Sequence, residues 1–139
     1  MIIHEIVIYA GAGILIAQYP KEKNLELTSA FFTAMRQFAM TELDGYGDVQ
    51  KLEFMKRKIV FLHSRQWEMT FAIIVDREDD ECIIMQFFRH VRDAFTNLLI
   101  GHENIATCHD DSLTDELKNI VDRSIVDFNK VSKKEKIFI

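Results

Sequence analysis

The residues best suited to bind a metal lie in one polar stretch, from His102 to Asp111. Zinc needs four ligands that converge on one point, and these usually come as two close pairs from separate parts of a chain. Cys108 and His109 are adjacent, so their side chains tend to point apart, and the sequence offers no second pair. We therefore expect a polar connection with no metal and no cofactor.

Nucleophilic catalysis needs a serine or cysteine beside a base, and the best candidate is Cys82. It follows the acidic residues 77–81 (REDDE), whose carboxylates disfavour a thiolate although the start of a helix favours one. The glycines of GAG (11–13) lack the lysine of a phosphate-binding loop and lead into a strand. We therefore predict that the chain is neither an enzyme nor itself a GTPase. Ordinary surface or strand positions are expected for the isolated histidines: His4, His63 and His90.

The charge balance argues against nucleic acid as a partner. The 139 residues include 17 lysines and arginines against 22 aspartates and glutamates, a formal net charge of −5. Two basic clusters, 51–58 and 130–136, each hold four basic residues and one glutamate, or +3. Nucleic acid is bound mainly by neutralising phosphates over a continuous basic surface, which neither cluster provides. Contact with a membrane is expected to be at most weak and peripheral.

The sequence also predicts a cytoplasmic location. No uninterrupted apolar run approaches the roughly 18 residues of a membrane span. The apolar N-terminal stretch contains His4 and Glu5 and has no basic start, so we do not expect a signal peptide. Cys82 and Cys108 make no disulfide framework, which fits a reducing compartment.

The spacing of apolar residues changes along the chain, and these changes predict the order of its strands and helices. Runs rich in β-branched residues predict five strands, the first two joined as a hairpin: 2–10, 14–20, 49–54, 59–64 and 68–76. Apolar residues spaced by three or four predict three helices. The first spans 24–42, the second begins within 77–81 and ends at Gly101, and the third spans about 113–131. This order predicts an α+β fold, with helices packed on a five-stranded antiparallel sheet. We expect one domain, 1–131, followed by a short basic and apolar tail, 132–139.

Three segments together resemble a longin domain, within the profilin-like and SNARE-like folds that include roadblock domains. They are the hairpin GAGILIAQY, the helix LTSAFFTAMRQFA, and the run from KLEFMKRKIVFLHS through EMTFAIIVD to the helix ending DAFTNLL. The resemblance covers roughly residues 2–131, and its two opening strands favour longin over roadblock. It implies a non-enzymatic trafficking module that dimerises, or that pairs with a small GTPase. A SNARE role is not expected, because no heptad-rich segment follows the last predicted helix.

The first predicted helix has two apolar stripes. One narrow sector, which we expect to face the sheet, contains Leu27, Phe31, Ala34 and Phe38. A second sector, about 100–140° away, is predicted to be an interface, and contact with a neighbouring helix is the alternative. Longin and roadblock pairs often dimerise through this helix, which favours the interface. The predicted interface residues, which include one from the tail, are Leu25, Phe32, Ala39, Met40, Leu43 and Phe138.

The strands are apolar on both faces. In 2–10 and 68–76, both alternating sets of positions contain apolar residues, such as Ile6 and Val7 or Phe71 and Ala72, whereas a sheet with one wet face alternates apolar with polar. We therefore expect cover on both faces of the sheet. The tail residues 137–139, a dimer mate or a GTPase are the candidate sources of part of that cover.

These features predict a non-enzymatic interaction module that dimerises with itself or with a longin- or roadblock-like partner. The resemblance implies that it binds or regulates a small GTPase. One alternative is an adaptor or tethering-complex subunit with an obligate heterologous partner. A small-ligand sensor is a weaker alternative, because it needs a deep polar pocket and the sequence shows no convergent polar set.

Overall fold

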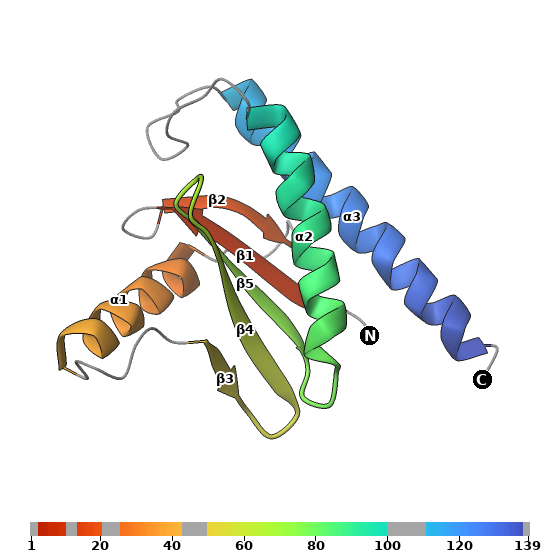
Figure 1. Cartoon of the computed structure of the whole chain (residues 1–139), viewed down its shortest axis with the longest axis horizontal. Coiled ribbons are helices and arrows are strands. Elements are labelled where there is room, and N and C mark those ends of the chain that lie inside the picture. Colours follow the sequence, from red (N-terminus) through yellow and green to blue (C-terminus); the bar gives the residue numbers. More distant parts are fainter. Residues whose placement is uncertain (1–2, 11–13, 21–25, 43–49, 100–110, 138–139) are drawn as a thin grey trace.

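The computed structural model describes residues 3–10, 14–20, 26–42, 50–99 and 111–137. The chain forms a five-stranded antiparallel sheet with three helices, which confirms the predicted α+β class and the predicted order (Figure 1). The elements are β1 (Glu5–Ala10), β2 (Ile14–Tyr19), α1 (Glu26–Glu42), β3 (Lys51–Glu53), β4 (Arg57–Ser64), β5 (Met69–Asp76), α2 (Glu81–Leu99) and α3 (Asp111–Ile137).

The strand order in the sheet is β2-β1-β5-β4-β3, so β1 and β5 lie in the centre. β1 pairs with β5 from Glu5–Ile74 to Ala10–Met69. Because β2 and β3 lie at opposite edges, the chain crosses the sheet between them, and α1 lies on that connection. β3 is shorter than its predicted range of 49–54, and its residues 51–53 are paired with Val60, Ile59 and Lys58 of β4.

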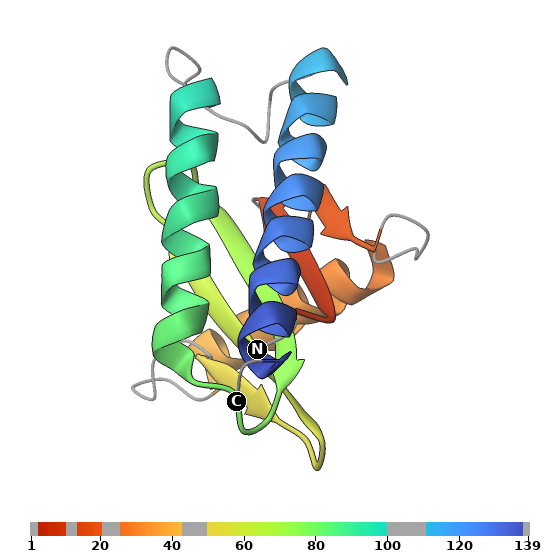
Figure 2. The same ribbon diagram turned by 90° about the vertical axis from the view of Figure 1, so that its right-hand side faces the viewer.

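Helices cover the sheet on both sides, as the two-sided apolar strands require. Figure 2 shows α2 and α3 side by side on one face, with α1 behind the sheet on the other. The larger core lies under α2 and α3 and includes Ile8, Phe71 and Phe95, all 0% exposed. A smaller core lies under α1 and includes Val7 and Tyr9. Helices of this chain itself therefore cover both faces. The apolar strands are for that reason weaker evidence for a partner protein.

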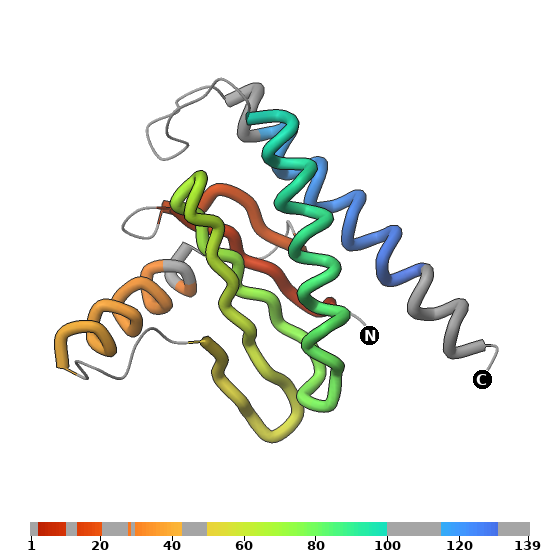
Figure 3. Tube along the Cα trace, viewed as in Figure 1, coloured from red at the N-terminus to blue at the C-terminus, as the bar shows by residue number. Residues whose placement is uncertain are grey.

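The last helix is longer than its predicted range of about 113–131. α3 continues to Ile137 and packs on the sheet through Leu117, Val121 and Ile125 at intervals of four. It is also attached to the start of the sheet, because the Asn129 side chain bonds both backbone groups of Ile3. The Ile3 N–H donates to Asn129 Oδ1 at 3.0 Å, and Asn129 Nδ2 donates to the Ile3 carbonyl at 3.4 Å. Figure 3 shows α2 and α3 close together in the upper part of the view and separating lower down. The division into a domain and a tail stays a prediction.

A charged cluster fixes the start of α2 against the β3–β4 hairpin. Asp80 caps α2, since its Oδ1 accepts the Cys82 N–H at 2.8 Å. The buried Lys58 on β4 donates Nζ to the Asp79 carbonyl at 2.6 Å, and it lies 3.7 Å from Glu81 Oε1. Lys51 on β3 donates to the same Glu81 oxygen at 3.1 Å. Two of the four basic residues of the 51–58 cluster are therefore engaged within the fold.

From this cluster we predict that Glu81 makes a pH-dependent contribution to the free energy of unfolding. The hydrogen bond from Lys51 lowers the pKa of the Glu81 carboxyl, and the charges of Lys51 and Lys58 act in the same direction. A lowered folded-state pKa gives stability that is present above the unfolded-state pKa, about 4.3, and is lost as the pH falls through the folded-state value. Glu81 is half exposed, so solvent screening should keep the contribution below about 1 kcal/mol.

We expect Glu81→Gln to lower the free energy of unfolding at pH 7. It should have little effect at a pH low enough to protonate the Glu81 carboxyl in both the folded and the unfolded protein. Urea unfolding of both proteins between pH 7 and pH 3 measures this difference. The control is Glu78→Gln, at an exposed glutamate in the turn before α2. An E81Q effect that persists undiminished at pH 3 would contradict the assignment.

Candidate interaction surface

One aromatic side chain anchors α1 to the sheet. Phe32 is 3% exposed, and its ring packs edge-on against Phe61 of β4, with centroids 5.1 Å apart. Its centroid lies 6.4 Å from that of Tyr9 on β1. Met35 packs against the same cluster, and Ala39 is also buried. These residues at i, i+3 and i+7 are the sheet-facing stripe of α1.

A second stripe of α1 faces away from this core. Phe31 is 61% exposed and Phe38 is 57% exposed, and Ala34 between them is exposed as well. The three follow the same i, i+3, i+7 spacing, so they share one face of the helix. We call Phe31, Ala34 and Phe38 the outer stripe. Two phenylalanines this exposed, two helical turns apart, are the feature of α1 that packing on the sheet does not explain.

The structure reverses the predicted roles of the two stripes. Phe31 and Phe38 were expected in the core and are exposed, whereas Phe32 and Ala39 were expected at an interface and are buried. The prediction for these four residues is wrong, because the ring of Phe32, and not that of Phe31, fits against Phe61. Adjacent residues differ by about 100° around a helix. Assigning the sheet-facing side to Phe31 in place of its neighbour Phe32 therefore exchanges the two faces.

The other predicted interface residues have different outcomes. Met40 is 61% exposed, but it lies about 160° around the helix from Phe38, so it is outside the outer stripe. Leu25, Leu43 and Phe138 lie outside the described residues. Of the predicted set, the described part of the chain therefore leaves only Met40 at the surface.

A further exposed apolar pair lies in the β3–β4 turn. Phe54 is 56% exposed and Met55 is 93% exposed, in a turn closed by the Phe54 N–H and the Arg57 carbonyl at 2.8 Å. The sequence analysis placed Phe54 in the predicted strand 49–54 and the segment in a basic cluster, and it did not single out the pair. The edge strand beside it is short and charged, with Lys51 and Glu53 both exposed. Short, charged edge strands resist the addition of another strand, which makes this edge a poorer docking site than the outer stripe.

Among the residues whose side chains the structure describes, no three histidine, cysteine, aspartate or glutamate residues are grouped to hold a metal. The polar stretch 102–110 lies outside the described residues. Cys82 is exposed on the first turn of α2. Among the helices as described, none is both long and apolar enough to cross a membrane.

Comparison with known proteins identifies no family for this chain. No protein-family model matches the sequence, and no curated protein matches it. A solved roadblock/LC7 domain from Streptomyces avermitilis is 16% identical with a TM-score of 0.45, over 60% of this chain and 73% of the other. A structure of MglB with a tetrameric arrangement is 10% identical with a TM-score of 0.46, over 88% and 79%. Likenesses of this size assign neither a family nor a function, and membership of the longin family stays a prediction.

The two stripes of α1 predict opposite effects at neighbouring positions. Phe32→Ala should lower the free energy of unfolding by about 3 kcal/mol or more, because it removes a buried ring and leaves a cavity. Phe31→Ala should change it by less than about 0.5 kcal/mol, because the ring is mostly exposed. Chemical denaturation of both variants, at a concentration where the protein is monomeric, measures the difference. Equal losses would mean that the faces of α1 are wrongly assigned.

Proposed function

We propose that this chain is a non-enzymatic protein-interaction module, which dimerises through the outer stripe of α1 and binds or regulates a small GTPase. The observation that carries the proposal is the exposure of Phe31 and Phe38 on one helix face. Aromatic side chains supply much of the binding energy at protein interfaces, and contiguous exposed apolar surface marks such sites.

The spacing within the outer stripe suits a second copy of the same helix. Most homo-oligomers are two-fold dimers, in which the same patch of both subunits meets itself. Phe31 and Phe38 are seven residues apart, and an apolar repeat of seven lies along one side of a helix that packs on another helix. The small Ala34 between them allows the two backbones to approach closely. The sheet-facing stripe keeps its own packing, so dimerisation does not require α1 to leave the sheet.

The class of the second partner comes from the resemblance to longin domains. Such a module holds a GTPase by shape and apolar contact, and it contributes no covalent chemistry. This agrees with the sequence-based prediction that the chain is not an enzyme. The exposed pair Phe54 and Met55 is a second apolar feature, on a different element from the outer stripe, and it offers the GTPase a contact.

We expect Phe31→Glu and Phe38→Glu each to convert the dimer into a monomer, because each places a charge in the centre of the interface. Gel filtration with light scattering at tens of micromolar protein measures the mass. Met40→Glu is the matched control, since Met40 has the same 61% exposure as Phe31 but lies on the other side of α1. A wild-type protein that is a strict monomer, or a dimer disrupted only by M40E, would refute the proposed interface.

Small GTPases loaded with GDP or with a non-hydrolysable GTP analogue test the second part of the proposal. We expect the immobilised wild-type chain to retain a GTPase, with a preference for one nucleotide state. Phe54→Ser with Met55→Ser should weaken this retention without changing the dimer. Retention of no GTPase in either state would refute the partner class. A chain that aggregates alone and becomes soluble with a different co-expressed protein would favour the adaptor alternative.

A further inference from the structure

The methionine side chains that the structure describes differ widely in exposure. Met69 of β5 is 1% exposed in the larger core, and Met35 and Met85 are partly buried against the two cores. Met40 on α1 is 61% exposed, and Met55 in the β3–β4 turn is 93% exposed. An oxidant must reach the sulfur of a methionine to convert its thioether into a sulfoxide. The exposures therefore predict that Met55 reacts first among these side chains.

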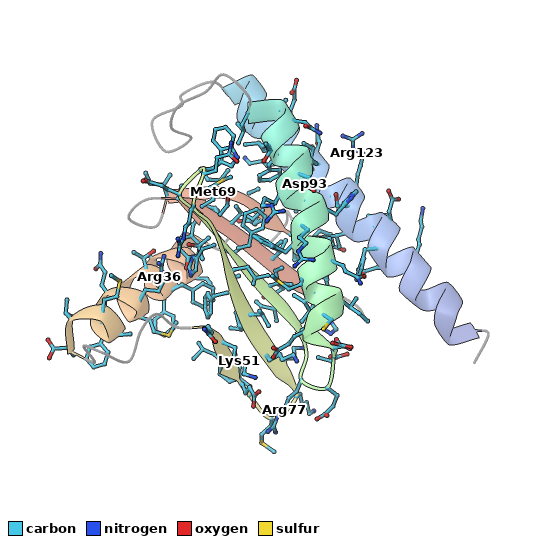
Figure 4. All side chains as sticks on the ribbon, in the orientation of Figure 1. Arg36, Lys51, Met69, Arg77, Asp93 and Arg123 are labelled. Atoms are coloured by element: carbon cyan, nitrogen blue, oxygen red, sulfur yellow. The ribbon has the colours of Figure 1, made fainter. Side chains whose placement is uncertain are left out.

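Backbone hydrogen bonds hold the turn that carries Met55. The Phe54 N–H donates to the Arg57 carbonyl at 2.8 Å across the turn. The Arg77 N–H, in the turn before α2, donates to the Lys56 carbonyl at 3.1 Å. Figure 4 labels Arg77 at this lower end of the sheet. The turn is thus fixed on both sides of Met55, and the exposure of this side chain is a feature of the folded turn.

Oxidation of Met55 changes the surface of the turn and not its fold. Phe54 is 56% exposed beside Met55, and the two form an apolar pair. A sulfoxide is polar where the thioether is apolar, which weakens interfaces that contain methionine. The hydrogen bonds that hold the turn join backbone groups, so they do not involve the sulfur. Oxidation of Met69 would instead place a polar group in the core.

We propose that Met55 is a reversible oxidation site, at which a peroxide converts the β3–β4 turn from an apolar docking contact into a polar surface. The sulfur lone pair attacks one oxygen of hydrogen peroxide, so that an S–O bond forms and the O–O bond breaks. The second oxygen leaves as hydroxide and takes the proton of the first, which gives water. The sulfur is oxidised and the peroxide is reduced. Methionine sulfoxide reductases reverse the change, with a dithiol that is oxidised to a disulfide as the sulfoxide oxygen leaves in water.

The role of this switch in binding rests on the proposed function, in which Phe54 and Met55 offer a GTPase a contact. The order of oxidation and the loss of apolar surface at the turn do not depend on that partner. The outer stripe contains no methionine, so oxidation of Met55 should leave the dimer intact.

Increasing doses of hydrogen peroxide on the folded full chain, followed by peptide mass spectrometry, test the oxidation site. Each methionine and cysteine is scored in its own peptide. We expect Met55 to be half oxidised at a several-fold lower dose than Met40, with Met69 still reduced. In guanidinium chloride the three should react at similar doses, because exposure sets the order. Met40 oxidised ahead of Met55, or an order and spread unchanged by unfolding, would overturn the proposal.

Met55→Leu and Met40→Leu are the matched variants for the change of surface, since leucine is apolar and has no sulfur. At the dose that oxidises Met55, the wild type and M40L should elute earlier from a hydrophobic-interaction column, because the turn has become polar. M55L should not shift, and sulfoxide reductases should restore the elution of the wild type. A shift of M55L equal to that of the wild type, or a shift that the reductases leave in place, would contradict the proposed site.

Retention of a GTPase on the immobilised chain separates this inference from the proposed function. The oxidised wild type should retain several-fold less GTPase than M55L treated in the same way. Equal retention by the two would refute the role of Met55 as a switch of binding. An untreated chain that retains no GTPase refutes the partner class, whereas the oxidation order and the elution shift still decide the oxidation site.

Discussion

The structure depends on a sheet whose centre is apolar on both faces. Seven of the eight residues of β5 are buried, as are five of the six residues of β1. Exposing either face of these strands to water would forfeit a large part of the hydrophobic stabilisation, so helices must cover both. The helices that the structure describes meet this requirement, with α2 and α3 on one face and α1 on the other.

The uneven division of helices accounts for where the outer stripe lies. Among the helices that the structure describes, α1 has no neighbour on its face of the sheet, and the outer stripe on its far side is exposed (Figure 2). The face under α1 also changes character along the strands. The paired positions run from Ile59 opposite Ile74, through Phe61 opposite Ala72, to His63 opposite Thr70. A cavity that Arg36 of α1 helps to line lies at this polar end.

Local pattern predicted the fold class, the element order and the presence of α2. The buried residues of α2, which include Phe87, Val91 and Phe95, lie in one broad stripe. α1 has two stripes of similar apolarity, and only the tertiary fit of Phe32 against Phe61 selects between them. Element ends were less predictable, because β3 is shorter than its predicted range and α3 continues to Ile137.

The cavity between α1 and the β4–β5 hairpin was missed for a related reason, because Arg36 is far in sequence from the hairpin. One signal was available. Two polar residues, His63 and Thr70, lie at equivalent distances from the turn, and a hairpin brings such positions together. Taken singly, His63 suggested an ordinary strand position. The contacts of Thr70 with both His63 and Arg36 become visible only when the hairpin and α1 are considered together.

The hydrogen bonds between Asn129 and Ile3 have a consequence for folding during synthesis. The two residues are 126 positions apart, and the neighbour of β1 in the centre of the sheet is β5. During synthesis β1 is made before β5, α2 and α3, so its central pairing and the α2–α3 cover come from later parts of the chain. Contacts this distant in sequence slow folding, and an apolar strand with an open edge is prone to aggregate before its partners are made. The nascent chain therefore leaves this edge of β1 unpaired until β5 has been synthesised.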